Sequence, residues 1–136
     1  MKKIFVIAVV AGMILAANTV FAQGTVDQII IYKVADPNTL SATLTGTGMN
    51  GFKLTVGEEI YVMAKGVDVD GKEVAIWPTW KAEKELSLSV VEGKSKVAKI
   101  KALQKGAPLF FSAVYIDDAG KKHKGEVMGE VKEPAK

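Results

Sequence analysis

Apolar or small residues occupy every second position in two neighbouring stretches of residues 54–80. The positions are Ile60, Val62, Ala64 and Gly66 in the first stretch, and Val74, Ile76, Pro78 and Trp80 in the second. Because successive side chains of a strand point to opposite faces, the pattern predicts two strands that bury these positions. Trp80 is therefore expected inside the domain and Trp77 outside. Asp68-Val-Asp-Gly71 predicts a turn between the strands, and Pro78, which has no N–H, predicts a bulge or an unpaired position.

Similar patterns predict strands on both sides of this segment. We expect them at residues 26–34, 52–56, 86–91, 96–103, 109–116 and 127–131, with a short edge strand at 40–44. Loops are expected at 45–51, 104–108 and 117–124, and a solvated loop or one helical turn at 81–85. The segment 109–116 is the most apolar of these and predicts a central strand, whereas Lys99 and Lys101 predict a solvated edge strand. The sequence therefore predicts an all-β sandwich or barrel of seven to nine short strands.

The first 22 residues have the pattern of a secretory signal peptide. It consists of Lys2 and Lys3, an uncharged apolar run at 4–15, and a small-x-small-like cleavage site at 20–22. We expect cleavage after Ala22, with Ala17 as the alternative, and a protein secreted to the periplasm, cell surface or medium. The apolar run is shorter than the roughly 20 residues of a membrane span, so none is expected after cleavage. Residues 23–132 would then form a single domain and 133–136 a disordered tail.

Composition excludes several functions for the mature chain. Without Lys2 and Lys3, 18 − 2 = 16 lysines face 15 acids, which is a formal charge of +1. All basic residues are lysines, interspersed with acids, so the concentrated basic face of a nucleic-acid-binding protein is not expected. The chain contains no Cys, which leaves neither disulfides nor a lipid-accepting Cys. The domain must therefore be stabilised by its packed core.

A series of residues in this order and spacing resembles the bacterial immunoglobulin-like domain, group 2. The residues are Leu54-Thr-Val-Gly57-Glu58, Ile60-x-Val62-x-Ala64, Asp70-Gly71, Trp80, Val90, the segment 96–102, Gly106 and Phe111-x-Ala113-x-Tyr115. The resemblance spans roughly residues 26–132. The chain departs from the family pattern at Pro78, at Ala107-Pro108 and in the glycine-rich loop before Phe52.

The resemblance implies an immunoglobulin-like β-sandwich of antiparallel strands, in which residues 54–80 form an arch between the two sheets. Members of the family are surface adhesins and envelope-associated proteins, in which the domains act as spacers or binding modules. The family brings no catalytic residues and no cofactor. We therefore expect a protein that is not an enzyme.

Few residues suggest chemistry of their own. Asp68 and Asp70 do not fit an EF-hand loop, because Gly66 and Trp77 would occupy the ligand positions at its two ends. Turn chemistry is the favoured interpretation, and calcium binding by the loops at 68–70 and 117–118 stays open. The single histidine, His123, lies among lysines and is expected to be exposed in a loop. Neither a Gly-x-Ser-x-Gly motif nor a metal-binding constellation is present in the sequence.

One outer face of the predicted sandwich carries large apolar side chains. If the strands that hold Trp80, Phe111 and Val127 share a sheet, their outward neighbours form one patch that consists of Trp77, Phe110, Val114 and Met128. An exposed apolar patch of this kind marks a contact surface. The sequence thus favours a secreted binding or adhesion module that contacts a protein or a glycan of the cell envelope. The alternative is a structural subunit that self-associates or docks in an envelope assembly.

Overall fold

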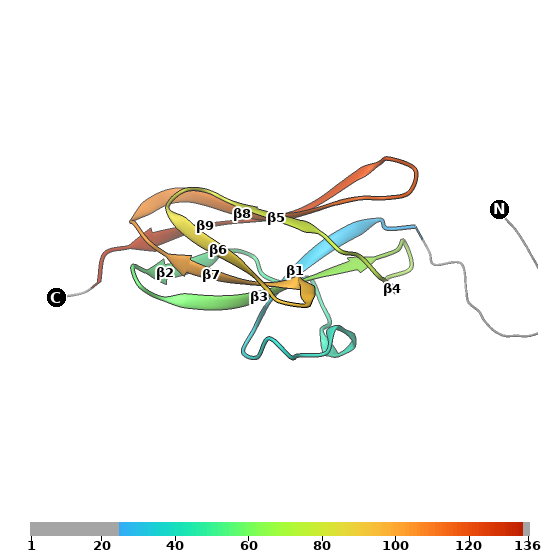
Figure 1. Cartoon of the computed structure of the whole chain (residues 1–136), viewed down its shortest axis with the longest axis horizontal. Coiled ribbons are helices and arrows are strands. Elements are labelled where there is room, and N and C mark those ends of the chain that lie inside the picture. Colours follow the sequence, from blue (N-terminus) through green and yellow to red (C-terminus); the bar gives the residue numbers. More distant parts are fainter. Residues whose placement is uncertain (1–24, 135–136) are drawn as a thin grey trace, which may run out of the picture.

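Two β-sheets pack face to face in the computed structural model, which describes residues 25–134 (Figure 1). The β3 sheet contains, in spatial order, β1 (Gln28–Val34), β3 (Glu59–Val67), β7 (Lys94–Ala102) and β6 (Leu86–Val91), and the two-residue β4 (Glu73–Val74) also pairs with β3. The β8 sheet contains β2 (Phe52–Thr55), β9 (Lys122–Lys132), β8 (Gly106–Ile116) and β5 (Thr79–Ala82). The predicted signal peptide lies outside the described residues.

The strand order is that of the immunoglobulin fold. In constant-type immunoglobulin domains, strands A, B, E and D form one sheet and strands C, F and G form the other. Assigning β1, β3, β5, β6, β7, β8 and β9 to A–G in chain order reproduces both sheets. The expected all-β, immunoglobulin-like sandwich is therefore confirmed, with nine strands in the described part of the chain. One pairing differs from the expected antiparallel arrangement, because β2 runs parallel to β9.

The core lies between the sheets and is formed by the alternating positions of each strand. Phe111 of β8 and Ile100 of β7 are at most 1% exposed, and Val62 of β3 is fully buried. Trp80 of β5 is also buried, and its indole Nε1 donates a hydrogen bond of 2.8 Å to the backbone oxygen of Ser95. The inward positions inferred from the alternation are thus confirmed.

The chain crosses from one sheet to the other at residues 75–78. β4 pairs with β3, while β5 pairs with β8, and the four residues between them belong to neither sheet. The strand expected here is therefore interrupted beside Pro78, as the missing N–H suggested. Ile76 and Pro78 are buried and Trp77 is exposed, so the alternation continues through the crossing. We call residues 75–78 the arch.

The segment between β1 and β2 covers part of the outer face of the β3 sheet (Figure 1). Leu44 packs on a small apolar cluster that includes Tyr32 and Met63. The Tyr32 hydroxyl donates to the backbone oxygen of Gly46 at 2.9 Å, and burial raises the pKa of Tyr32. The Met49 N–H donates to the backbone oxygen of Ile31 at 2.8 Å. The loop expected at residues 45–51 is therefore anchored on the sheet by these hydrogen bonds.

The prediction of an edge strand at residues 40–44 is wrong. Ser41–Thr43 forms a 3₁₀ turn, and the neighbouring Leu40 is 70% exposed. The Thr39 hydroxyl donates to the backbone oxygen of Asp36 and the Thr43 hydroxyl to that of Leu40, each at 2.7 Å. Such local hydrogen bonds compete with strand pairing, which explains the difference.

Two strand predictions also need correction. The lysine-bearing β7 is not a sheet edge, because it pairs with both β3 and β6. Its Lys99 lies on the outer face, where the Nζ atom is 3.8 Å from a carboxylate oxygen of Glu59. β8 begins at Gly106, inside the expected loop 104–108, with an irregular register between Gly106 and Leu109. In both cases the alternation predicted the faces correctly, but it carried no information about neighbouring strands.

Candidate functional site

Trp77 is presented to solvent at the centre of the arch. Its side chain is 65% exposed, whereas Ile76 before it is only 3% exposed and Pro78 after it is buried. The two buried neighbours fix the backbone on both sides of the tryptophan. An exposed indole is thereby held on a packed segment rather than on a loose loop.

Tyr115, near the end of β8, contacts Trp77. The ring centroids are 5.8 Å apart and the ring planes meet at 78°, an edge-to-face arrangement. Such aromatic pairs contribute about 0.5–1.5 kcal/mol beyond their area burial. Tyr115 has the inward parity of β8, but it lies next to the last residue of the strand, and its ring is half-buried. The contact therefore fixes the orientation of both rings.

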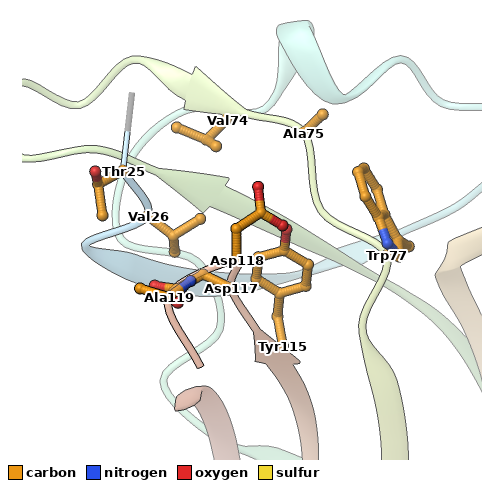
Figure 2. Close-up of a pocket in the computed structure, with 9 residues that line it drawn as sticks. All are labelled: Thr25, Val26, Val74, Ala75, Trp77, Tyr115, Asp117, Asp118 and Ala119. Atoms are coloured by element: carbon orange, nitrogen blue, oxygen red, sulfur yellow. Dashed lines mark hydrogen bonds between the residues drawn. The ribbon is translucent and has the colours of Figure 1, made fainter. Parts of the chain in front are cut away.

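A pocket of about 440 Å³ opens beside this aromatic pair (Figure 2). Its lining residues are Thr25, Val26, Val74, Ala75, Trp77, Tyr115, Asp117, Asp118 and Ala119. Val26 and Val74 are buried and provide apolar walls. Figure 2 shows the Asp118 carboxylate close to the Tyr115 ring in this view, with Trp77 at the side. The pocket therefore combines two aromatic rings, an apolar wall and an acidic edge.

The acidic edge belongs to the turn between β8 and β9, whose first residue is Asp117. One carboxylate oxygen of Asp117 accepts hydrogen bonds from the N–H groups of Ala119 and Lys121, at 3.0 and 2.9 Å. Its other oxygen lies 2.9 Å from Nε2 of His123. The hydrogen bond with His123 and those from the backbone lower the pKa of Asp117. Both carboxylate oxygens of Asp117 are thus hydrogen-bonded within the turn and to His123, whereas Asp118 makes no hydrogen bond or ion pair with the described residues.

His123 is not the exposed loop histidine that the lysines around it suggested. It lies in β9, opposite Tyr115 of β8, and is 6% exposed. The burial alternation of β9 continues from Val127 through Gly125 to His123. Extending the predicted closing strand backwards by this parity would have placed His123 inside. Its position next to the pocket turn makes it a support for Asp117.

The structure brings the four predicted contact residues onto one side of the sandwich, but not into a single patch. Phe110 and Met128 are direct cross-strand partners, half-buried and 55% exposed respectively. Val114 is half-buried and pairs with Thr79, further along β8 toward Trp77. Between these positions, Ser112 pairs with Lys81 on one side and with Glu126 on the other. A polar row therefore separates the Phe110–Met128 pair from Trp77.

Trp77 and Met128 consequently border different hollows. Trp77 also borders a second pocket of about 330 Å³, which reaches the turn between β6 and β7 and includes Lys94 and Lys96. Met128 lines an open groove of about 750 Å³ with Phe52 and Pro108. The sequence pattern did not identify Tyr115 as a site residue, because its position in the alternation points inward. It did not identify Asp118, because an acid in a turn is usually explained by its role in the turn. No sequence signal identified the pocket that joins them.

The other acidic loop, at residues 68–71, repeats the same turn. One carboxylate oxygen of Asp68 accepts hydrogen bonds of 2.9 Å from the N–H groups of Asp70 and Lys72. Gly71 has φ +82° and the corresponding Gly120 has φ +84°, a conformation that glycine adopts without strain. Turn chemistry thus accounts for Asp68. Within residues 25–134, no three His, Cys, Asp or Glu side chains are grouped so that they could hold a metal ion.

Comparisons with known proteins show the fold alone. No protein-family model and no curated protein matches the chain. Among solved structures, domains 1–6 of the surface layer protein SbsC align over 90% of this chain with a TM-score of 0.57 and 12% identity. This chain spans only 14% of that chain. A nucleoside hydrolase-related hypothetical protein from Saccharophagus degradans aligns over 80% of this chain and 26% of its own, with a TM-score of 0.45 and 12% identity.

Proposed function

We propose that the chain is a secreted, non-enzymatic binding module of the bacterial cell envelope, which holds a protein or a glycan at the pocket beside Trp77. Trp77 supports this proposal most strongly, because it is exposed on a packed arch, contacts Tyr115 and borders a pocket. Covering the exposed part of an indole contributes about 3 kcal/mol to association, from its area and the transfer energy per unit area. A partner would gain that energy without reordering the arch.

The surroundings favour binding over catalysis. Of the two acids that line the pocket, Asp117 is held by the turn and by His123, so Asp118 is its one uncommitted carboxylate. Glycoside hydrolysis commonly needs a pair of such groups. Within the described lining, neither the Thr25 nor the Tyr115 hydroxyl is hydrogen-bonded to a carboxylate that could act as its base. These residues suit recognition of a ligand rather than its conversion.

The envelope location rests on the sequence. The signal-peptide pattern of residues 1–22 directs the chain out of the cytoplasm, and the residues from Leu54 to Tyr115 resemble the bacterial immunoglobulin-like domain, group 2. The surface layer protein with a similar fold fits the same location. No helix among residues 25–134 is long and apolar enough to cross a membrane.

A retention assay tests this function. The mature chain from Gln23 is labelled and incubated with isolated envelopes, and the bound fraction is compared between wild type and Trp77→Ser. We expect the substitution to abolish retention, because the indole supplies the contact area. Val90→Ser serves as the matched control, since Val90 is also exposed, at 49%, but lies on β6. Undiminished retention of Trp77→Ser would refute the proposal.

The alternative function, a structural subunit that self-associates, is favoured by the edge strand β6. Its six residues, Leu86–Val91, include no charge and no proline, and they pair only with β7. Natural edge strands are commonly blunted by charges, proline or bulges. The register of β6 is irregular only between Val90 and Val91, so its remaining residues leave an edge that is open to strand addition. Light scattering at high concentration tests this: a dimer that Ser89→Lys returns to monomer supports self-association, and a monomeric wild type excludes it.

A further inference from the structure

We infer that the pocket beside Trp77 takes a neutral or amine-bearing sugar ring, an inference that rests on the proposed binding function. Its volume, about 440 Å³, falls within the roughly 300–1,000 Å³ of small-molecule sites. A protein partner would cover about 800 Å² of each surface. The adjoining face of the β8 sheet carries the polar row of Lys81, Ser112 and Glu126. A small ligand therefore fits the site better than a protein surface.

The aromatic geometry suits a sugar. A pyranose ring has an apolar face of C–H groups and a rim of hydroxyls, so it needs a flat apolar platform with polar groups beside it. The Trp77 indole provides the platform, because it is largely exposed. The Tyr115 ring, at 78° to the indole, forms a second wall instead of covering the platform in parallel. The two rings thus make a corner against which one sugar ring can rest.

Two polar groups at this corner have no partner. The Tyr115 hydroxyl makes no hydrogen bond with the described residues, although the ring is half-buried and a tyrosine hydroxyl in such a position usually has a partner. The Asp118 carboxylate is equally free within residues 25–134, and it lines the same pocket as Tyr115. A carboxylate accepts hydrogen bonds, whereas a hydroxyl donates and accepts. Together they match the hydroxyls on the rim of a sugar.

The charge of the lining selects among sugars. The described lining contains Asp117 and Asp118 and no lysine. Asp117 is half-buried and Asp118 is exposed. Because like charges repel, a uronic acid or a phosphorylated sugar is disfavoured, and an amino group would be attracted. Lys94 and Lys96 line the second pocket that Trp77 borders, and the Nζ atom of Lys96 lies 3.7 Å from a carboxylate oxygen of Glu73. The charge prediction therefore concerns the sugar ring beside Tyr115.

The test is binding of the mature chain to immobilised oligosaccharides of defined charge. The probes are cellotetraose and chitotetraose as neutral members, deacetylated chitotetraose as the amine-bearing member, and tetragalacturonate as the acidic member. We expect binding to at least one neutral or amine-bearing probe and none to tetragalacturonate. Binding to the acidic probe alone, or to no probe, overturns the inference.

Four variants assign the binding to this pocket. Trp77→Ala is expected to abolish binding. Asp118→Asn should weaken it at least tenfold, because a hydrogen bond to a charged group is lost. Tyr115→Phe should weaken it about three- to tenfold, because a hydrogen bond to a neutral group is lost. Asp70→Asn alters an exposed acid of the equivalent turn at 68–71 and should leave binding unchanged. Equal losses in Asp118→Asn and Asp70→Asn would overturn the inference.

The two proposals fail in different ways. If no sugar probe binds but envelope retention still depends on Trp77, the site holds a protein and only the sugar inference is overturned. If envelope retention is independent of Trp77, the proposed function itself is overturned. The oligosaccharide array and the retention assay are therefore run on the same preparations.

Discussion

The two tryptophans of the chain lie three residues apart and have opposite environments. Trp80 in β5 is 7% exposed and hydrogen-bonded to Ser95, and it pairs with Ala113 of the central strand β8. Trp77 in the arch is 65% exposed and contacts one other ring. Side-chain alternation through the arch produces this difference, since a shift of three positions changes the face. The same residue type thus stabilises the core at one position and is exposed beside a pocket at the other.

Replacing the buried tryptophan should have the largest effect. Trp80→Ala removes a core ring and leaves the Ser95 oxygen without its donor, so the free energy of unfolding should fall by about 3–5 kcal/mol. Urea unfolding followed by circular dichroism measures the loss. A change below about 1 kcal/mol would mean that the two tryptophans do not differ as described.

An intermediate effect is expected where the core meets the pocket wall, at Asp117. Its pKa is lowered in the folded state, chiefly by His123. A lowered folded-state pKa stabilises the fold above the usual pKa of roughly 3.9, and this contribution is lost as the pH falls through the lowered value. Asp117→Asn should therefore destabilise the domain at pH 7, and the difference from wild type should shrink in acid.

Urea unfolding at pH 7 and in acid measures this dependence. Asp68→Asn is the matched control, because Asp68 makes the same turn hydrogen bonds but has no histidine partner. We expect a smaller loss at pH 7 for the control. If Asp117→Asn were no more harmful than Asp68→Asn, the role of His123 as a support of the pocket turn would be wrong.

The smallest effect on stability is expected at the exposed tryptophan. Trp77→Ala removes the contact with Tyr115 and little else, so the loss should be about 1 kcal/mol or less. The variant also simplifies the fluorescence, because only Trp80 remains. Acrylamide should quench wild-type fluorescence strongly and that of Trp77→Ala weakly. Strong quenching in the variant would place Trp80, not Trp77, at the surface.

Period-two alternation was enough to predict an all-β sandwich or barrel, because each strand buries one face, and the resemblance to the bacterial immunoglobulin-like domain favoured the sandwich. It placed Trp80, Phe111 and Ile100 inside and Trp77 outside. It could not give neighbours across the sheet, so it made the lysine-bearing β7 an edge and missed the parallel pairing of β2 with β9. Register depends on contacts between residues distant in sequence, which one strand's pattern does not encode.

The candidate site was only partly predictable for the same reason. Trp77, Phe110, Val114 and Met128 were expected to form one patch on parity alone, yet the register puts Ser112 and its charged neighbours between them. Tyr115 and Asp118 join Trp77 because the arch and the turn between β8 and β9 end at the same corner of the sandwich. That meeting is a product of topology. Composition led to a wrong prediction at His123. The surrounding lysines suggested an exposed loop, whereas the alternation of β9 places the ring inside.

Photo-crosslinking tests whether position 77 contacts an envelope component. A photoreactive aromatic side chain, which keeps a ring at the exposed position, replaces Trp77 in the mature chain, and the chain is irradiated with native envelopes. A second preparation carries the same group at Val90. We expect a reproducible protein or sugar adduct from position 77 and none from position 90. The same adducts from both positions, or none from position 77, would contradict it.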